Sequence, residues 1–379
     1  MEGKIYLAAL AAFRKFGPRR LEKLRNFFPD WLSAFNSSFS ELRTAGIEEI
    51  IAEEFLAERK KINPAELEKN LHDEGIKIIS FSDLEYPKNL KQLSDPPALL
   101  YLRGELRLNL PLLAVVGARK NTPYGERAIN SLIPSLITKN IGIVSGLALG
   151  TDALAHEKTL DCGGYTIAVL GTGIDRKTVY PFSNQNLSEK IISTGGALIS
   201  EFPPQTAPLR QNFPLRNRII TGLAQGVLVV EAGLKSGSLI TAHIALDENR
   251  EVLAVPGSIF SSQSIGTNNL IKQGAKTVLT TDDILEIFGL AEEPSPVKIS
   301  QDKLPFNNNS VGKTAFASAD WSGLSTEERT ILLNLSSEPT NADELKDSTN
   351  LDIRIINSTL SILEIKGLVR NIGGNYVIC

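Results

Sequence analysis

Apolar residues recur at helical spacing through the first 75 residues and in short, continuous runs after them. Stretches such as "IYLAALAAF", "RLEKLRNFF" and "ELRTAGIEEIIAEEF" predict short helices. From Ile76 onward, β-branched runs end in glycine or serine, as in "IKIIS", "LAVVG", "IGIVSG", "TIAVLG", "ALISE", "GVLVVE", "VLAVPG" and "TVLTT". Helix-like stretches separate most of them, which is typical of a parallel sheet covered on both faces. We therefore predict a helical domain at 1–75 and a doubly wound α/β domain with a mostly parallel sheet at 76–291.

The pattern changes twice more toward the C-terminus. Residues 292–320 are polar, proline-bearing and aperiodic, so they are interpreted as a linker. Helical periodicity returns at Trp321, with one helix in "NADELKDSTN" and another at Leu351–Lys366. A hairpin closed by Gly373–Gly374 follows. This order predicts a winged helix-turn-helix domain at 321–379.

The composition narrows the classes of function. The 379 residues carry a net charge of −3, with two cysteines and three histidines. The blocks 1–75, 76–320 and 321–379 hold 12, 23 and 5 basic residues against 13, 22 and 8 acidic ones. No block is a basic tail, so any polyanion site must be a local patch. The histidines are scattered, so no metal site is predicted. No apolar run is long enough to span a membrane. The two cysteines offer no disulfide framework, which indicates a reducing cytoplasm.

Glycine and polar residues gather where four predicted strands end. The loops are "VVGARKNTPYG", "VSGLALGTDALAH", "VLGTGIDRKTVYP" and "VVEAGLKSGSLITA". Ligands of doubly wound sheets bind beyond these carboxyl ends, and backbone N–H groups at glycines and helix starts suit phosphate. The alternative is ordinary strand-to-helix turns, which also favour glycine and serine. No loop has the spacing of a dinucleotide-binding or P-loop motif, so no cofactor is predicted.

The segment "NFPLRNRIITG" places two arginines at the start of a predicted helix. Arg216 and Arg218 lie two positions apart, so their side chains diverge around the helix. An arginine fork suits phosphate oxygens. Alternatively, one or both arginines form structural bridges to Glu201, Glu231 or Asp175. One arginine of each kind is also compatible with the sequence.

The acidic residues do not assemble a catalytic arrangement. Glu201 and Glu231 end predicted strands, whereas Asp152 and Asp175 lie in loops. No Ser/His/Asp or Cys/His set can be formed from the sequence, and capping of loop amides or pairing with arginines accounts for these carboxylates. We therefore predict a binding protein rather than an enzyme. The enzymatic alternative is a phosphoribohydrolase of the lysine-decarboxylase-like type, although the Pro-Gly-Gly-x-Gly-Thr motif of those enzymes is missing from this sequence. A third hypothesis is a sensor that binds a nucleotide without converting it.

The motifs from about Ile76 to Leu290 together resemble the DNA processing protein A family, DprA or Smf. The most specific block is "FPLRNRIITG…VVEA…SGSLITA". The resemblance implies an extended Rossmann fold, an N-terminal domain of the sterile-alpha-motif or helix-hairpin-helix type, and a C-terminal winged helix. It also implies single-stranded DNA binding in natural transformation, protection of incoming strands, loading of the recombinase RecA, and a homodimer through the Rossmann domain. Gly117-Ala118-Arg119 and Gly150-Thr151-Asp152 depart from the usual Gly-Ser-Arg and Gly-Ile-Asp without losing a charge.

The resemblance implies that the arginine segment lies beside the first glycine loop. A local ring of cations then captures phosphates, with little sequence preference because aromatic residues are only 6% of the chain. For the homodimer, apolar Ile265, Leu270, Ile271 and Val278 are candidates, unless they cover the domain's own core. The predicted DNA- and phosphate-binding residues are Gly117, Ala118, Arg119, Lys120, Ser145, Gly146, Gly171, Gly173, Lys177, Phe213, Arg216, Asn217, Arg218, Lys235, Ser236, Gly237 and Ser238.

Overall fold

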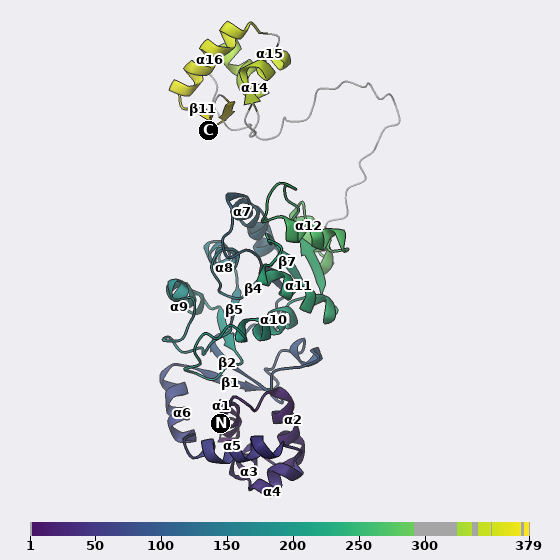
Figure 1. Ribbon diagram of the computed structural model, residues 1–379. Helices are drawn as coiled ribbons and strands as arrows, with labels where there is room; N and C mark the ends of the chain where they lie inside the picture. Colours follow the sequence, from purple (N-terminus) through teal and green to yellow (C-terminus); the bar gives the residue numbers. More distant parts are fainter. Residues whose placement is uncertain (1, 292–323, 336–339, 350, 373–374, 379) are drawn as a thin grey trace. The chain divides into compact units, whose positions relative to one another are not determined.

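The computed structural model describes residues 2–291, 324–335, 340–349, 351–372 and 375–378. The chain forms two compact units, Met1–Ser295 and Pro296–Cys379 (Figure 1). The predicted linker at 292–320 and the Gly373–Gly374 turn lie outside the described residues. None of the described helices is long and apolar enough to cross a membrane. The described residues also contain no group of three or more His, Cys, Asp or Glu side chains that could hold a metal ion.

Six helices build the N-terminal part of the first unit. They are α1 (Glu2–Ala12), α2 (Pro18–Phe27), α3 (Trp31–Asn36), α4 (Phe39–Thr44), α5 (Glu49–Arg59) and α6 (Pro64–Asp73). The stretch "ELRTAGIEEIIAEEF" was expected to form one helix, but it is divided between α4 and α5. Gly46 between them has φ +84°, a left-handed conformation that favours glycine and ends the helix.

The N-terminal helices and the sheet share one apolar core. Phe13, Phe16 and Phe55 are buried among the helices, and the same cluster continues through Tyr101 and Leu198 of the sheet. Ring centroids of Phe16 and Phe55 are 4.7 Å apart. The helical part is therefore held to the sheet by continuous apolar packing.

A nine-stranded sheet formed by the described residues organises the rest of this unit, in the order β1-β2-β6-β5-β4-β3-β7-β8-β9. Strands β3 to β9 run parallel, whereas β1 pairs antiparallel with β2 and β2 with β6. The strand β2 was not among the expected strands, and β9 is only two residues long. The bounds are β1 (Lys77–Ser80), β2 (Leu99–Gly104), β3 (Leu112–Val116), β4 (Gly142–Ser145), β5 (Thr166–Leu170), β6 (Ala197–Ser200), β7 (Gly226–Val229), β8 (Glu251–Ala254) and β9 (Lys276–Thr277).

Helices cover both faces of this sheet, as the apolar strands predict. Alternate residues of β3 point to opposite sides: Leu113 and Val115 pack with α7, α8 and α13, whereas Ala114 and Val116 pack with α10, α11 and α12. The helices are α7 (Pro123–Thr138), α8 (Thr151–Asp161), α9 (Gln185–Ser193), α10 (Asn212–Leu223), α11 (Gly237–Asp247), α12 (Ile265–Lys272) and α13 (Thr281–Leu285), with 3₁₀ turns at Leu90–Gln92, Phe182–Asn184 and Glu286–Phe288.

The second unit is a small winged helix. It contains α14 (Thr326–Asn334), α15 (Ala342–Thr349), α16 (Ile353–Ile365), β10 (Thr340–Asn341), β11 (Val369–Ile372) and β12 (Asn375–Ile378). The predicted helix at Leu351–Lys366 corresponds to α16, whose N-cap is Asp352. The short strand β10, which the sequence did not predict, adds a third strand to the expected hairpin. Leu345, Ile356 and Leu360 fill its core.

Candidate nucleic-acid interface

Three glycine-containing loops meet at the carboxyl edge of the sheet. The strands β5, β4 and β3 are neighbours and parallel, so the loops that follow them lie side by side. The start of α10 joins them because this helix follows β6 and packs against β5, β4 and β3. A small hollow of about 30 Å³ opens between these segments, lined by Arg119, Gly146, Ala148, Leu149, Tyr180, Pro181, Phe213 and Arg216.

Arg119 is the exposed cation of this hollow. Its guanidinium carbon lies 5.8 Å from the ring centroid of Phe213. Among the residues that the structure describes, no carboxylate forms an ion pair with Arg119. The charge is therefore uncompensated and available to an anion.

Arg216 forms the floor of the hollow. Its side chain is buried, and its guanidinium donates a hydrogen bond to the carbonyl oxygen of Val169. Burial lowers the pKa of Arg216 to about 10, against the opposing effect of Asp152. At that pKa the guanidinium still carries its charge near neutral pH. Gly146 passes directly over it, and a side chain there would overlap the guanidinium.

Asp152 fixes the loop after β4 around Arg216. Its carboxylate accepts hydrogen bonds from the N–H groups of Gly146 at 3.1 Å and Ala148 at 3.3 Å. Burial raises the pKa of Asp152, and the nearby Arg216 opposes this rise. His156 is buried on the same helix, where burial and then Arg216 lower its pKa to about 3. His156 is therefore neutral near pH 7, and its Nδ1 lies 2.7 Å from the hydroxyl of Thr166.

Arg218 has a different environment from Arg216. Its Nη2 contacts both carboxylate oxygens of Glu201 at 2.7 Å, and its Nε lies 3.8 Å from Asp95. Burial raises the pKa of Glu201 although Arg218 opposes the rise. Arg218 therefore forms the bridge to a strand-end carboxylate that was one of the expectations, whereas Arg216 lines the hollow.

Several predicted residues support the hollow without lining it. The hydroxyl of Ser145 donates to the carbonyl of Val115 at 2.6 Å, so it faces the sheet. Gly171 lies against Phe213, Gly117 against Thr151, and Gly173 against Asp175. Ala118 is buried, Asn217 is half-buried on α10, and Lys120 and Lys177 are exposed in the loops after β3 and β5.

The fourth predicted loop does not reach this hollow. Ser236 caps α11 by accepting the N–H of Ser238, and Lys235 and Gly237 are exposed beside it. None of Lys235, Ser236, Gly237 and Ser238 is among the residues that line the hollow described above. The loop after β7 instead holds the start of α7. Glu231 accepts hydrogen bonds from the N–H of Thr122 at 2.8 Å and from the Thr122 hydroxyl at 2.5 Å, and Thr122 is the N-cap of α7.

Sequence reasoning did not select Ala148, Leu149 and Pro181 as site residues. Leu149 is 48% exposed in the structure. The signal in the sequence that could have identified it is an apolar residue inside a glycine-rich loop after a strand. Tyr180 contacts Phe213 at 5.9 Å between ring centroids, and Phe182 is 77% exposed nearby in the chain. The rim of the hollow therefore combines one free cation with apolar and aromatic side chains.

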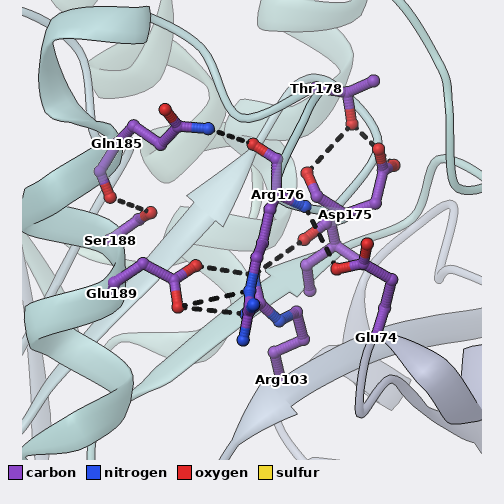
Figure 2. A network of polar contacts seen from close by, with 9 residues as sticks. Glu74, Arg103, Asp175, Arg176, Thr178, Gln185, Ser188 and Glu189 are labelled. Carbon is purple, nitrogen blue, oxygen red and sulfur yellow. Dashed lines mark hydrogen bonds and ion pairs between the residues drawn. The ribbon is translucent and has the colours of Figure 1, made fainter.

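A polar network holds the loop after β5, which carries Lys177 and Tyr180. Figure 2 shows Glu189 of α9 between two arginines: its oxygens lie 3.0 Å from Arg103 and 3.7 Å from Arg176. The N–H of Arg176 donates to Glu74 at 3.4 Å, at the end of α6. Asp175 accepts the Thr178 hydroxyl at 2.7 Å. The loop is thus tied to α9, to β2 and to the N-terminal helices.

The four carboxylates singled out from the sequence all make structural contacts. Asp152 and Asp175 accept hydrogen bonds within their loops, Glu201 pairs with Arg218, and Glu231 holds the start of α7. These contacts are of the kinds expected as the alternative to catalysis, namely capping of loop amides and pairing with arginine.

The matching family models and the matching relatives belong to one family. The family model described as DNA recombination-mediator protein A matches residues 77–289, and the DprA winged helix domain model matches residues 317–375. Protein Smf of Escherichia coli is 39% identical over 295 residues, which cover 77% of this chain and 74% of that protein.

Two solved structures extend the similarity to the fold. DNA processing protein A (DprA) from Streptococcus pneumoniae matches with a TM-score of 0.64 and 34% identity, covering 74% of this chain and 97% of that one. DNA processing protein A from Helicobacter pylori matches with a TM-score of 0.50 and 29% identity, covering 56% and 95%. The Helicobacter pylori structure concerns the unique single-stranded DNA binding mode of that protein.

Proposed function

We propose that this chain, which belongs to the DNA recombination-mediator protein A (DprA/Smf) family, binds single-stranded DNA through the phosphate backbone at the hollow beyond β3, β4 and β5. The observation that carries the proposal is Arg119, an exposed guanidinium without an ion-pair partner among the described residues, beside the buried charge of Arg216. A local positive field attracts phosphates even though the chain is acidic as a whole.

The rim supplies contacts for bases as well as phosphates. Tyr180 and Phe213 are aromatic, Leu149 adds an exposed apolar surface, and the exposed ring of Phe182 follows two residues after Tyr180 in the chain. Aromatic stacking tolerates any base because every base has a π face. Bases in a duplex are already stacked on each other, so this rim favours a single strand. We infer little sequence preference, since phosphate contacts carry no base information.

The biological role that fits this binding is recombination mediation during DNA-mediated transformation. The family description names a recombination mediator, and such a protein must hold a strand and then transfer it to a recombinase. We propose that the chain protects incoming single strands and loads RecA on them. Backbone capture by a few cations is suited to transfer, because each contact is weakened by competing ions.

The winged helix is not proposed as the main DNA site. In α16 and its flanks, Arg354 and Lys366 are offset by Asp352 and Glu364. Lys366 is also paired with Glu328 at 2.6 Å. This is too little free charge to neutralise several phosphates.

A binding titration tests the function. We expect the full chain to shift a labelled single strand at lower protein concentration than the matching duplex, and then to speed RecA filament formation on that strand. A chain ending at Leu290 should keep most of the single-strand affinity. Equal affinity for duplex and single strand would contradict the proposed hollow, and a loss beyond about tenfold on truncation, roughly 1.4 kcal/mol, would move the site toward the winged helix.

Self-association through the α/β domain is the remaining part of the proposal, and the surface expected for it needs correction. Leu270 and Val278 are buried in the domain's own core, so they are not available to a partner. Ile271 packs half-buried against the same core, and Ile265 is also half-buried. Ile259 and Phe260 follow β8, Leu279 follows the parallel neighbour β9, and all three are at least 75% exposed. We propose this apolar edge as the dimer surface.

Light scattering checks the dimer. The chain has a mass of 41.2 kDa, and we expect a species of twice that mass at micromolar concentration. The Ile259→Ser/Phe260→Ser variant should be monomeric, since replacing two exposed apolar side chains removes the core of the contact. Leu84→Ser is the matched control, because Leu84 is fully exposed in the segment between β1 and β2. Dimers that survive the double substitution would exclude this surface.

A further inference from the structure

A second and larger cavity lies between the N-terminal helices and the sheet domain. Its volume is about 310 Å³, and its walls come from α2, from Trp31 of α3, from Ser80 at the end of β1, and from the segment that joins β1 to β2. Ligand sites are commonly about 300–1,000 Å³ in volume and favour such domain boundaries. None of its lining residues lines the Arg119 hollow.

Helix α2 gives this cavity three cations: Arg19, Lys23 and Arg25. Arg19 and Lys23 are four residues apart and therefore neighbours on the helix surface. Arg19 is exposed, and no described residue forms a hydrogen bond or ion pair with its side chain. The ammonium of Lys23 donates to the carbonyl of Gly46 at 2.7 Å, which orients it without neutralising it.

Two carboxylates also line the cavity, and each already faces a cation. Glu22 lies 3.6 Å from Arg25, and Asp95 lies 3.8 Å from Arg218 of α10. Lys23 also lies close enough to Glu48 to lower the pKa of that carboxylate, so among the described residues Arg19 is the lining cation for which no charged partner is found. An anionic group is therefore the complementary ligand.

Flat side chains form the rest of the wall. Trp31 and Phe81 line the cavity, and the guanidinium of Arg25 lies 4.8 Å from the centroid of Phe81. Aromatic rings and guanidinium planes are the surfaces on which unpaired bases stack. An acidic peptide would use the cations but would leave this flat surface without a matching group.

We propose that this cavity binds a nucleoside phosphate, with Arg19 and Lys23 on the phosphate and Trp31 beside the base. The ligand is either a free nucleotide or one unit of a single strand, since both present the same chemistry. The inference does not depend on DNA binding at Arg119, because the two sites share no lining residue.

Tryptophan fluorescence reports directly on this cavity. The chain has two tryptophans, so Trp321→Phe leaves Trp31 as the single emitter in the full-length protein. We expect dAMP to quench Trp31 fluorescence in a saturable way, with a Kd below about 1 mM. Inorganic phosphate should compete weakly, because it lacks the base.

Reversing the charge of one residue on α2 distinguishes binding in this cavity from non-specific attraction of dAMP to the positive charge of the domain. Arg19→Glu should weaken dAMP binding at least tenfold, whereas Arg14→Glu should change it little. Arg14 is an exposed arginine of the same domain that does not line the cavity. Ser82→Phe is the second test, because a large side chain at this exposed lining position fills the cavity without changing charge or adding an emitter. It should also abolish quenching.

The Arg119→Ala variant shows whether the cavity binds a free nucleotide or a nucleotide unit of a DNA strand, because DNA binding at the Arg119 hollow is weakened in it. If oligo(dA) quenches Trp31 there and Arg19→Glu removes the effect, the cavity holds a unit of a DNA strand. If only dAMP quenches, the ligand is a free nucleotide. Absence of saturable quenching, equal loss with Arg14→Glu, or stronger competition by polyglutamate than by dAMP would each overturn the proposal; the last result would indicate an acidic peptide partner.

Discussion

Arg119→Ala will weaken binding of every single-stranded sequence by a similar factor, about tenfold or more. A hydrogen bond to a charged group contributes about 1.5–3 kcal/mol, and among the described residues no carboxylate pairs with Arg119, whose charge faces the ring of Phe213 instead. On a plot of log affinity against log salt, the slope should flatten by about 0.7, which is one phosphate contact of a single strand. Filter binding or fluorescence anisotropy at several salt concentrations measures both quantities.

The control for this substitution removes the same charge elsewhere. Arg370 is exposed on β11 of the winged helix, so Arg370→Ala should leave both affinity and slope nearly unchanged. The melting temperature of Arg119→Ala should match that of the unaltered protein, because the side chain is exposed. An unchanged slope in folded Arg119→Ala protein would refute phosphate capture at this hollow.

Arg218→Ala will instead lower the free energy of unfolding, by about 3 kcal/mol near neutral pH. Arg218 and Glu201 form a largely buried pair, and removing one partner leaves the other charge without compensation. Single-strand affinity should change little, because Arg218 does not line the hollow. Urea unfolding gives the free energy, and the binding titration gives the affinity.

The loss of stability should depend on pH with a definite sign. Burial already raises the pKa of Glu201 above 4.5, and removing Arg218 raises it further. When the pKa of a carboxyl group is higher in the folded than in the unfolded protein, the group favours folding at low pH, where it is protonated. This contribution to the free energy of unfolding is lost as the pH rises through the pKa of the folded state. The deficit of Arg218→Ala should therefore be smaller at about pH 5 than at about pH 7.5.

A second substitution separates charge from shape in this pair. In the Arg218→Ala background, Glu201→Gln removes the uncompensated carboxylate and should restore part of the lost stability at about pH 7.5. It should also remove the pH dependence of the deficit. A deficit that stays constant with pH would show that packing of the arginine, rather than its charge, supports this edge of the sheet.

Sequence reasoning predicted the layered α/β core, because continuous apolar strands ending in glycine leave few alternatives. The same reasoning missed β2, whose residues Leu99–Gly104 pair antiparallel between β1 and β6. That strand is defined by partners far away in the chain, which local periodicity cannot reveal. The break between α4 and α5 was missed for a more local reason, since the apolar positions continue across Gly46.

For the candidate site, too, part could be predicted from the sequence and part depended on the tertiary structure. The residue types were readable from the sequence: glycines at strand ends, and Arg119, Arg216 and Arg218 in turns or at a helix start. Strand order then decided which of them meet, because neighbouring β5, β4 and β3 bring their loops together while the loop after β7 serves α7. Packing of α10 decided that Arg216 lies under Gly146 and that Arg218 meets Glu201. Composition and spacing determine which chemistry a chain carries, but the partner of each buried charge depends on segments brought together only when the sheet forms. Only the tertiary structure therefore shows that Arg216 lines the hollow and that Arg218 pairs with Glu201.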